Sequence, residues 1–108
     1  MANFIVTKSF KKSAKVLDKR YKSFKEDLAS FMDIYEELPA FDLGGGLKKI
    51  RMIIGSKGKG KSGGARVISY DLLTYNKDKD VVLLYIYDKE DMDNVSMDFL
   101  KQLKKEYL

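Results

Sequence analysis

Residues 47–75 predict two β-strands joined by a loop that is rich in glycine and lysine. Polar and apolar residues alternate over 47–54, as is typical of a strand with one buried face. The loop follows over 55–64, and 65–75 again has the pattern of a long strand. The residues of the first strand expected to face the core are Ile50, Met52 and Ile54, with Lys49 and Arg51 on the opposite face.

Two helices are expected before this hairpin. Ser9 is placed to cap a first helix over 10–21. Ser23 and Glu26 fit the capping box of a second helix, which Pro39 ends. The apolar residues of the second helix repeat at helical spacing and are expected to be core: Phe24, Leu28, Phe31, Met32 and Tyr35.

The remaining segments complete a β-α-α-β-β-β-α order. Residues 3–7 predict a strand at a sheet edge, 40–46 a loop, and 81–87 (VVLLYIY), apolar on both faces, a central strand. Ser96 or Asn94 can cap a last helix. Its apolar stripe contains Phe99, Leu100, Leu103 and Tyr107.

A chain of 108 residues supports one domain with one core, so residues 1–108 are expected to form a single domain. The order of elements predicts an α+β fold. In this fold the N-terminal strand and a helical hairpin pack on a small, mainly antiparallel β-sheet, and a helix closes the chain.

The positive charge gathers around the loop. Seven cations and no acid lie between Leu43 and Tyr70, whereas 71–98 hold eight acids and three lysines. The net charge of +5 and this separation favour a polyanionic partner, for which nucleic acid is the commonest choice. The seven cations are Lys48, Lys49, Arg51, Lys57, Lys59, Lys61 and Arg66.

The chain contains no cysteine and no histidine. This excludes disulfides, cysteine nucleophiles and the Ser-His triad, and it removes most transition-metal sites. Any catalysis must come from Lys, Arg, Tyr, Asp or Glu. The N-terminus does not resemble a secretory signal, and no stretch approaches the roughly 20 apolar residues of a membrane span. We therefore expect a cytoplasmic protein without metal or cofactor.

The string GSKGKGKS at 55–62 matches the P-loop pattern G-x-x-x-x-G-K-[ST]. A P-loop requires a helix to begin at its lysine, but here Gly63-Gly64 and a strand pattern follow, so this interpretation is rejected. A solvated turn is a second interpretation, but it leaves the cations on the flanking strands unexplained. The third interpretation is a nucleic-acid cleft, in which strand cations position a phosphate and loop lysines neutralise charge.

A family resemblance supports the third interpretation. The segment KKIRMIIGSKGKGKSGGARVISY, followed by VVLLYIYDKED, resembles the RelE/ParE toxin superfamily, and most of all the HigB/RelE-like toxins of bacterial type II toxin–antitoxin systems. The most specific part is K-x-R…G-K-S-G-G-x-R-V. The run K-x-x-x-x-L-x-K-x-Y-x-S-x-x-x-D-L in the helical hairpin also fits, so the resemblance covers nearly the whole chain.

The resemblance implies a metal-independent endoribonuclease that cleaves mRNA in the ribosomal A site, where the RNA 2′-hydroxyl attacks the adjacent phosphate. Arg66 matches the family's central-strand arginine and would bind the transition-state phosphate, the alternative being an ion pair with Asp42 or Asp88. Lys49 and Arg51 occupy basic active-site positions, and one of them would accept the proton, although a solvated strand face is the alternative.

The other cations have less specific implied roles. Lys89 would be a phosphate contact or an acid, with an ordinary loop lysine as the alternative. The cations that would bind RNA backbone or ribosomal RNA are Lys48, Lys57, Lys59 and Lys61.

The chain departs from the family at two places. Ala65 stands where the best-studied members have an aromatic residue, and 93–96 (DNVS) stand where they have a tyrosine. Tyr70, Tyr85 or Tyr87 could substitute for that tyrosine as the proton donor, although strand tyrosines more often serve in packing.

The resemblance also implies a partner. It would be a cognate antitoxin, often with a helix-turn-helix DNA-binding domain, that covers the basic cleft. Two alternatives to the ribonuclease remain: a ParE-like poison of DNA gyrase with the same fold, and an inactive relic that binds only its antitoxin and operator.

Overall fold

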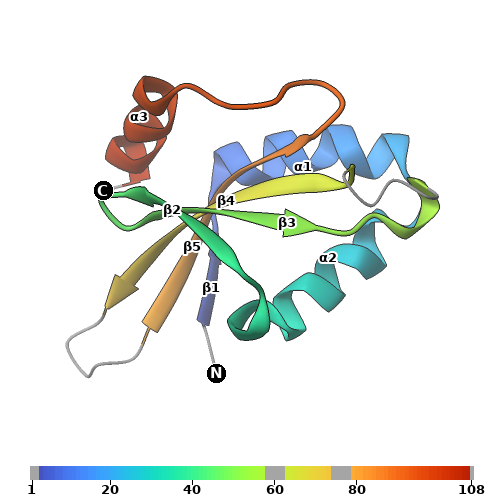
Figure 1. Ribbon diagram of the computed structural model, residues 1–108, viewed down its shortest axis with the longest axis horizontal. Helices are drawn as coiled ribbons and strands as arrows, with labels where there is room; N and C mark the ends of the chain where they lie inside the picture. Colours follow the sequence, from blue (N-terminus) through green and yellow to red (C-terminus); the bar gives the residue numbers. More distant parts are fainter. Residues whose placement is uncertain (1–2, 58–62, 74–78, 108) are drawn as a thin grey trace.

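The computed structural model describes residues 3–57, 63–73 and 79–107. Within these ranges the chain forms a β-sheet, three α-helices and two short 3₁₀ helices (Figure 1). In chain order the elements are β1 (Asn3–Val6), α1 (Lys8–Arg20), α2 (Phe24–Asp33), η1 (Tyr35–Glu37), β2 (Ala40–Gly44), β3 (Leu47–Met52), η2 (Gly55–Lys57), β4 (Ala65–Leu73), β5 (Lys79–Asp88) and α3 (Met97–Tyr107).

The described strands form one sheet in the order β1-β5-β4-β3-β2. β1 runs parallel to β5, and each of the other neighbouring pairs is antiparallel. The expected edge position of the N-terminal strand is confirmed, as is the interior position of the apolar strand at 81–87, which lies within β5. The predicted α+β architecture with a C-terminal helix is therefore confirmed.

The sheet carries a hydrophobic core on each face. On one face α1 and α2 pack against the strands, and on the other face α3 does so. Burial of apolar residues on both faces explains why β5 reads as a continuous apolar run. The first core contains Phe10, Leu17, Phe24, Phe31, Ile50, Met52, Val67 and Leu83, and the second contains Leu47, Ile68, Val82, Leu84, Tyr87, Leu100 and Leu103.

A β-bulge in β5 changes which side chains reach each core. Ile68 pairs with Tyr85 whereas Ser69 pairs with Leu83, so Leu84 has no partner in the register. An extra residue of this kind reverses the alternation beyond it. Leu83 and Ile86 therefore face α1 and α2, while Tyr85 and Tyr87 pack with the α3 core.

The loop predicted over 40–46 is wrong in its first part, because this segment forms strand β2 on the free edge of β3. The turn itself lies at Gly44, Gly45 and Gly46, whose φ angles are 91°, 61° and 84°. Positive φ is accessible to glycine at little cost, so the glycines make the tight turn and leave the preceding residues free to pair. Backbone pairing, rather than strand composition, creates β2.

Both predicted helix starts need correction. Thr7, not Ser9, caps α1, since its hydroxyl accepts a hydrogen bond from the Phe10 amide at 3.2 Å. Ser23 does precede α2, but its hydroxyl donates to the Asp27 carboxylate at 2.6 Å instead of capping the helix, so the capping box with Glu26 is wrong. The acceptor side of the same hydroxyl is used by the backbone amide of Ser56 at 2.8 Å, so it is not directed at the first turn of α2.

The second helix ends earlier than predicted, since α2 stops at Asp33 and a 3₁₀ turn follows before Pro39. The strand predicted over 81–87 is longer than predicted, since β5 spans Lys79–Asp88. β4 is described as far as Leu73, and 74–78 lie outside the described residues. At the last helix, the Ser96 hydroxyl accepts a bond from the Phe99 amide at 3.2 Å, which confirms Ser96 as the capping residue. None of the described helices has the length and apolar character needed to cross a membrane.

Candidate functional site

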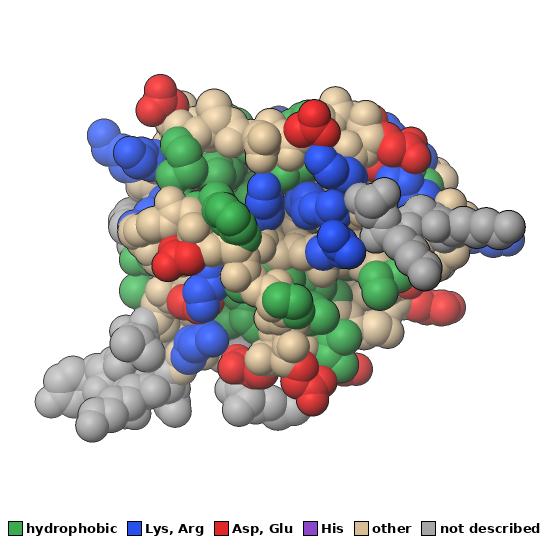
Figure 2. All heavy atoms as spheres, viewed as in Figure 1, with side chains coloured by type: hydrophobic (Ala, Val, Ile, Leu, Met, Phe, Trp, Pro, Cys, Tyr) green, Lys and Arg blue, Asp and Glu red, His purple; other side chains and the backbone are tan. Residues whose placement is uncertain are grey.

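Lys49, Arg51 and Arg66 project from the same face of the sheet. Arg51 and Arg66 are direct partners in the antiparallel register of β3 and β4, so their side chains leave the sheet side by side. Lys49 lies two residues before Arg51 and pairs with Ile68, a member of the α3 core. Figure 2 shows Lys and Arg side chains gathered on this face over β3 and β4. We refer to Lys49, Arg51 and Arg66 as the cationic triad.

The Arg66 guanidinium is held by its own backbone surroundings. Its Nη1 donates to the carbonyl of Gly63 at 2.8 Å and to that of Ala65 at 3.2 Å. Partial burial, followed by the charge of Arg51, lowers the pKa of Arg66 from its usual value. Because arginine stays protonated in proteins, two guanidinium charges lie close together on this face.

Lys49 is positioned by two contacts. Its ammonium donates to Oδ1 of Asn94 at 3.1 Å, in the loop between β5 and α3. The same ammonium lies 5.4 Å from the centre of the Phe41 ring, and Phe41 is the partner of Lys49 in the register of β2 and β3. These two contacts hold the Lys49 ammonium between β2 and the loop that precedes α3.

An open groove of about 560 Å³ runs along this face. Its polar lining is the cationic triad, and its apolar lining comes from β2, the segment before β2 and the residue that follows β3. The residues that line it are Leu38, Pro39, Ala40, Phe41, Lys49, Arg51, Ile53 and Arg66. A groove with three cations on one wall can bind a phosphate and stabilise charge that develops on it.

The structure separates two of the predicted RNA contacts from this triad. Lys48 has the opposite parity on β3 and lies on the face covered by α1 and α2, where its ammonium is 2.6 Å from the Asp71 carboxylate. The side chain of Lys57 is only 7% exposed and its ammonium is 2.6 Å from Asp88. Neither ammonium is presented to the groove, whereas Lys59 and Lys61 lie outside the described residues.

Lys89 follows β5 and is partly exposed. Its ammonium lies 2.8 Å from the carboxylate of Asp93, four residues later in the same loop. This ion pair fixes Lys89 on the loop that also supplies Asn94 to Lys49. Lys89 does not line the groove described above.

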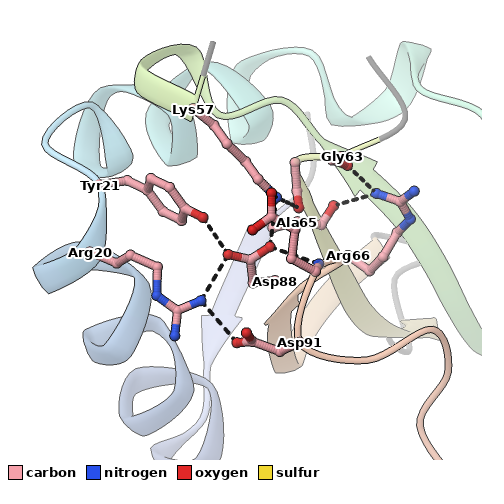
Figure 3. Close-up of polar contacts among 10 residues, drawn as sticks. Arg20, Tyr21, Lys57, Gly63, Ala65, Arg66, Asp88 and Asp91 are labelled. Atoms are coloured by element: carbon pink, nitrogen blue, oxygen red, sulfur yellow. Dashed lines mark hydrogen bonds and ion pairs between the residues drawn. The ribbon is translucent and has the colours of Figure 1, made fainter. Parts of the chain in front are cut away.

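Sequence reasoning missed a buried ionic network around Asp88. The Asp88 side chain is fully buried and accepts hydrogen bonds from Arg20 at 2.9 Å, Tyr21 at 2.5 Å and Lys57 at 2.6 Å (Figure 3). Burial by itself would raise the pKa of Asp88, but these bonds outweigh it, and the pKa lies well below its usual value. The sequence named Asp88 only as an alternative ion-pair partner of Arg66, whereas its partners in the structure are Arg20, Tyr21 and Lys57.

The network ties down both ends of the glycine–lysine loop. The Lys57 ammonium also donates to the Gly64 carbonyl at 3.3 Å, and the same carbonyl accepts the Lys89 amide at 3.1 Å. Asp88 lies on the α1 side of the sheet, and Figure 3 shows the Arg66 guanidinium pointing away from it. Asp88 therefore anchors the end of the loop that leads into β4, the strand that carries Arg66.

Of the three tyrosines considered as proton donors, Tyr87 lies nearest to the cationic triad because it pairs with Arg66 in the register. Burial raises the pKa of Tyr87, and the Arg66 charge opposes this rise. Tyr85 packs edge-on against Phe99, with 5.1 Å between ring centres. Tyr70 lies farther along β4 beside Lys104, at 4.5 Å from the ring centre.

Residues 5–107 match the model of a protein family described as the RelE toxin of the RelE / RelB toxin-antitoxin system. The match begins within β1 and ends at the last residue of α3. It includes both strands that carry the cationic triad.

Proposed function

The chain belongs to the RelE toxin family, and from this premise we propose that it is a ribosome-dependent, metal-independent mRNA endonuclease that inhibits translation. Family membership indicates the toxin of a toxin–antitoxin system. The observation that carries the finer proposal is the pairing of Arg51 with Arg66 beside Lys49, on the wall of an open groove.

The proposed reaction is attack by the RNA 2′-hydroxyl on the adjacent phosphorus. A 2′-oxygen–phosphorus bond forms and the bond from phosphorus to the 5′-oxygen breaks, which leaves a cyclic phosphate and a free 5′-hydroxyl. Arg66 and Arg51 stabilise the negative charge that develops on the phosphoryl oxygens, since guanidinium groups can donate two parallel bonds. Of Lys49 and Arg51, Lys49 is the one that accepts the 2′-proton, because arginine stays protonated in proteins.

The remaining cations contribute in different ways to this proposal. Lys89 is a phosphate contact or proton donor on the loop after β5. Lys59 and Lys61 bind RNA backbone or ribosomal RNA. Lys48 and Lys57 were expected to do the same, but their pairing with Asp71 and Asp88 favours a structural role for both.

The antitoxin is proposed to cover the cationic triad. An acidic or helical segment would complement the groove. By the resemblance to the HigB branch, we propose that this antitoxin carries a helix-turn-helix domain.

The test is induced expression in a bacterial host, with growth, labelled-methionine incorporation and primer extension on an abundant mRNA as readouts. The wild type is compared with Arg66→Ala and with Lys25→Ala, which removes a cation from α2 whose side chain is 84% exposed. Growth arrest, loss of protein synthesis and new mRNA ends are expected from the wild type and from Lys25→Ala, and all three should disappear in Arg66→Ala.

Two results would contradict the proposal. Growth arrest with intact mRNA and normal early translation would indicate a ParE-like gyrase poison. Damage to the host DNA would then be measured to test that alternative. No arrest from well-expressed, folded protein would indicate an inactive relic, for which antitoxin binding alone would persist.

A further inference from the structure

Phe41 is a large apolar side chain that the fold leaves in solvent. It lies on β2, the edge strand of the sheet, and is 65% exposed. Its register partner on β3 is Lys49, whose ammonium lies 5.4 Å from the ring centre. The ring therefore lies on the same face of the sheet as the cationic triad.

Phe41 is part of an apolar surface that continues across the groove. Ile53, which follows β3, is 76% exposed, and Pro39 also lines the groove. The cationic triad lines the same groove. We call Pro39, Phe41 and Ile53 the apolar wall.

A nucleotide matches this division of the groove. Its phosphate is an anion, and its base is a flat ring with an apolar face. Proteins that bind single-stranded nucleic acid commonly combine cations along the backbone with aromatic rings on which bases stack. Three cations and an exposed ring line the same groove, so charge complementarity favours RNA over a purely apolar peptide as the occupant.

We propose that Phe41 is a stacking platform for an unpaired RNA base, with Pro39 and Ile53 completing the apolar side of a nucleobase site. The proposal deepens the function proposed above and rests on it, because it places a base next to the phosphate that the cationic triad holds. Phe41 then selects for an unstacked nucleotide, while the chemistry stays with the cationic triad.

The test uses short, fluorescently labelled, uncleavable 2′-O-methyl oligoadenylate at low salt. An abasic oligonucleotide with the same number of phosphates is measured alongside. The proteins are the wild type, Phe41→Ala, Phe41→Trp and the control Val16→Ala, which shortens a 54% exposed apolar side chain on α1. Circular dichroism establishes that each variant is folded.

The wild type should bind oligoadenylate more tightly than the abasic strand. Phe41→Ala should weaken binding to oligoadenylate by about tenfold and binding to the abasic strand far less, because the stacking contact is lost whereas Lys49 keeps its hydrogen bond to Asn94. Phe41→Trp should retain the preference for bases, and Val16→Ala should behave as the wild type.

Equal affinity of the wild type for the two oligonucleotides would overturn the proposal, as would an unchanged base preference in Phe41→Ala. If Phe41→Ala instead weakens only the antitoxin complex, the apolar wall belongs to a protein partner and the proposal is also overturned. These results are separable from the proposed function, since mRNA cleavage by the wild type on ribosomes is scored independently. If the protein binds oligoadenylate in preference to the abasic strand but does not cleave mRNA, the proposed nucleobase site stands and the proposed ribonuclease activity is wrong.

Discussion

At the scale of single residues, Arg66 carries the most specific expectation. Its guanidinium is oriented by the carbonyls of Gly63 and Ala65 and lies beside Arg51. A planar fork with several donors is suited to two phosphoryl oxygens, whereas an ammonium is a single point of charge. The proposed role therefore depends on shape as well as on charge.

Arg66→Lys is expected to lower mRNA cleavage on ribosomes by about 10²-fold, because it retains the charge but loses the paired donors. The rate of appearance of mRNA ends with purified ribosomes measures this. Retention of near wild-type cleavage by the lysine variant would show that Arg66 contributes charge alone.

Asp88 is a buried carboxylate on which the stability of the fold depends. Replacing it by Asn leaves the ammonium of Lys57, whose side chain is 7% exposed, with only the longer ionic contact to the exposed Glu90 at 3.5 Å. We expect Asp88→Asn to lower the free energy of unfolding by about 3–5 kcal/mol, as for other broken buried pairs. Urea unfolding measures the loss, and a second substitution, Lys57→Met, should recover part of it because the buried charge is then removed.

The same carboxylate sets an acid limit on the fold. Because the pKa of Asp88 is lower in the folded chain than in the unfolded one, the carboxylate stabilises the fold fully above the unfolded value of about 3.9. This contribution declines as the pH falls from there toward the folded-state pKa. The difference in unfolding free energy between wild type and Asp88→Asn should therefore shrink below about pH 4. A difference that stays constant with pH would contradict the ionic role.

At the scale of elements, the β3–β4 connection is shaped by glycine at one end. Gly64 has a φ angle of 67°, and a Cβ atom there would lie 2.5 Å from the Met52 carbonyl oxygen. Gly55, at the other end, has room for a Cβ at 3.5 Å from Asp27. A side chain at position 64 would thus clash with the backbone, whereas one at position 55 would fit.

Gly64→Ala is expected to cost at least about 1–2 kcal/mol of stability from the left-handed backbone alone, with the backbone clash in addition. It should also lower cleavage, because Arg66 lies two residues later, near the start of β4. Thermal unfolding of Gly64→Ala beside the matched variant Gly55→Ala checks this. Equal melting temperatures for the two variants would mean that the backbone of the connection relaxes freely.

Elements also show where prediction from sequence succeeded. The helical stripe from Phe24 to Tyr35 and the alternation of Ile50 and Met52 identified their buried faces, because each pattern is set by local geometry. Strand β2 was missed because its residues form a strand only by pairing with β3. Strand propensity mainly reflects the packing of side chains on a half-buried sheet, so it does not identify a strand whose side chains are mostly exposed.

At the scale of the whole molecule, the sheet divides the basic residues between its faces. Lys49 lines the groove, whereas its neighbour Lys48 forms an ion pair with Asp71 on the face covered by α1 and α2. The net charge of +5 is therefore less informative than the face on which each cation lies. The affinity for RNA should therefore depend on which face of the sheet loses a cation, and not on the net charge alone.

Lys49→Ala and Lys48→Ala remove the same charge from adjacent residues. For binding of single-stranded, uncleavable RNA, Lys49→Ala should reduce the magnitude of the slope of log affinity against log salt by about 0.7, as for one lost phosphate contact. Lys48→Ala should leave the slope unchanged. Titrations at several salt concentrations measure both, and equal slopes for the two variants would contradict the assignment of faces.

The sequence by itself determined the class of fold, the apolar faces of the main elements and the family, because these follow from local periodicity and from a long, specific motif. Only the tertiary structure decided which cations meet. The pairing of Arg51 with Arg66, the bulge at Leu84 that turns Tyr87 toward them, and the capture of Lys57 by Asp88 all depend on register and on contacts between distant segments. Register is a property of two strands together, so no reading of either strand alone contains it.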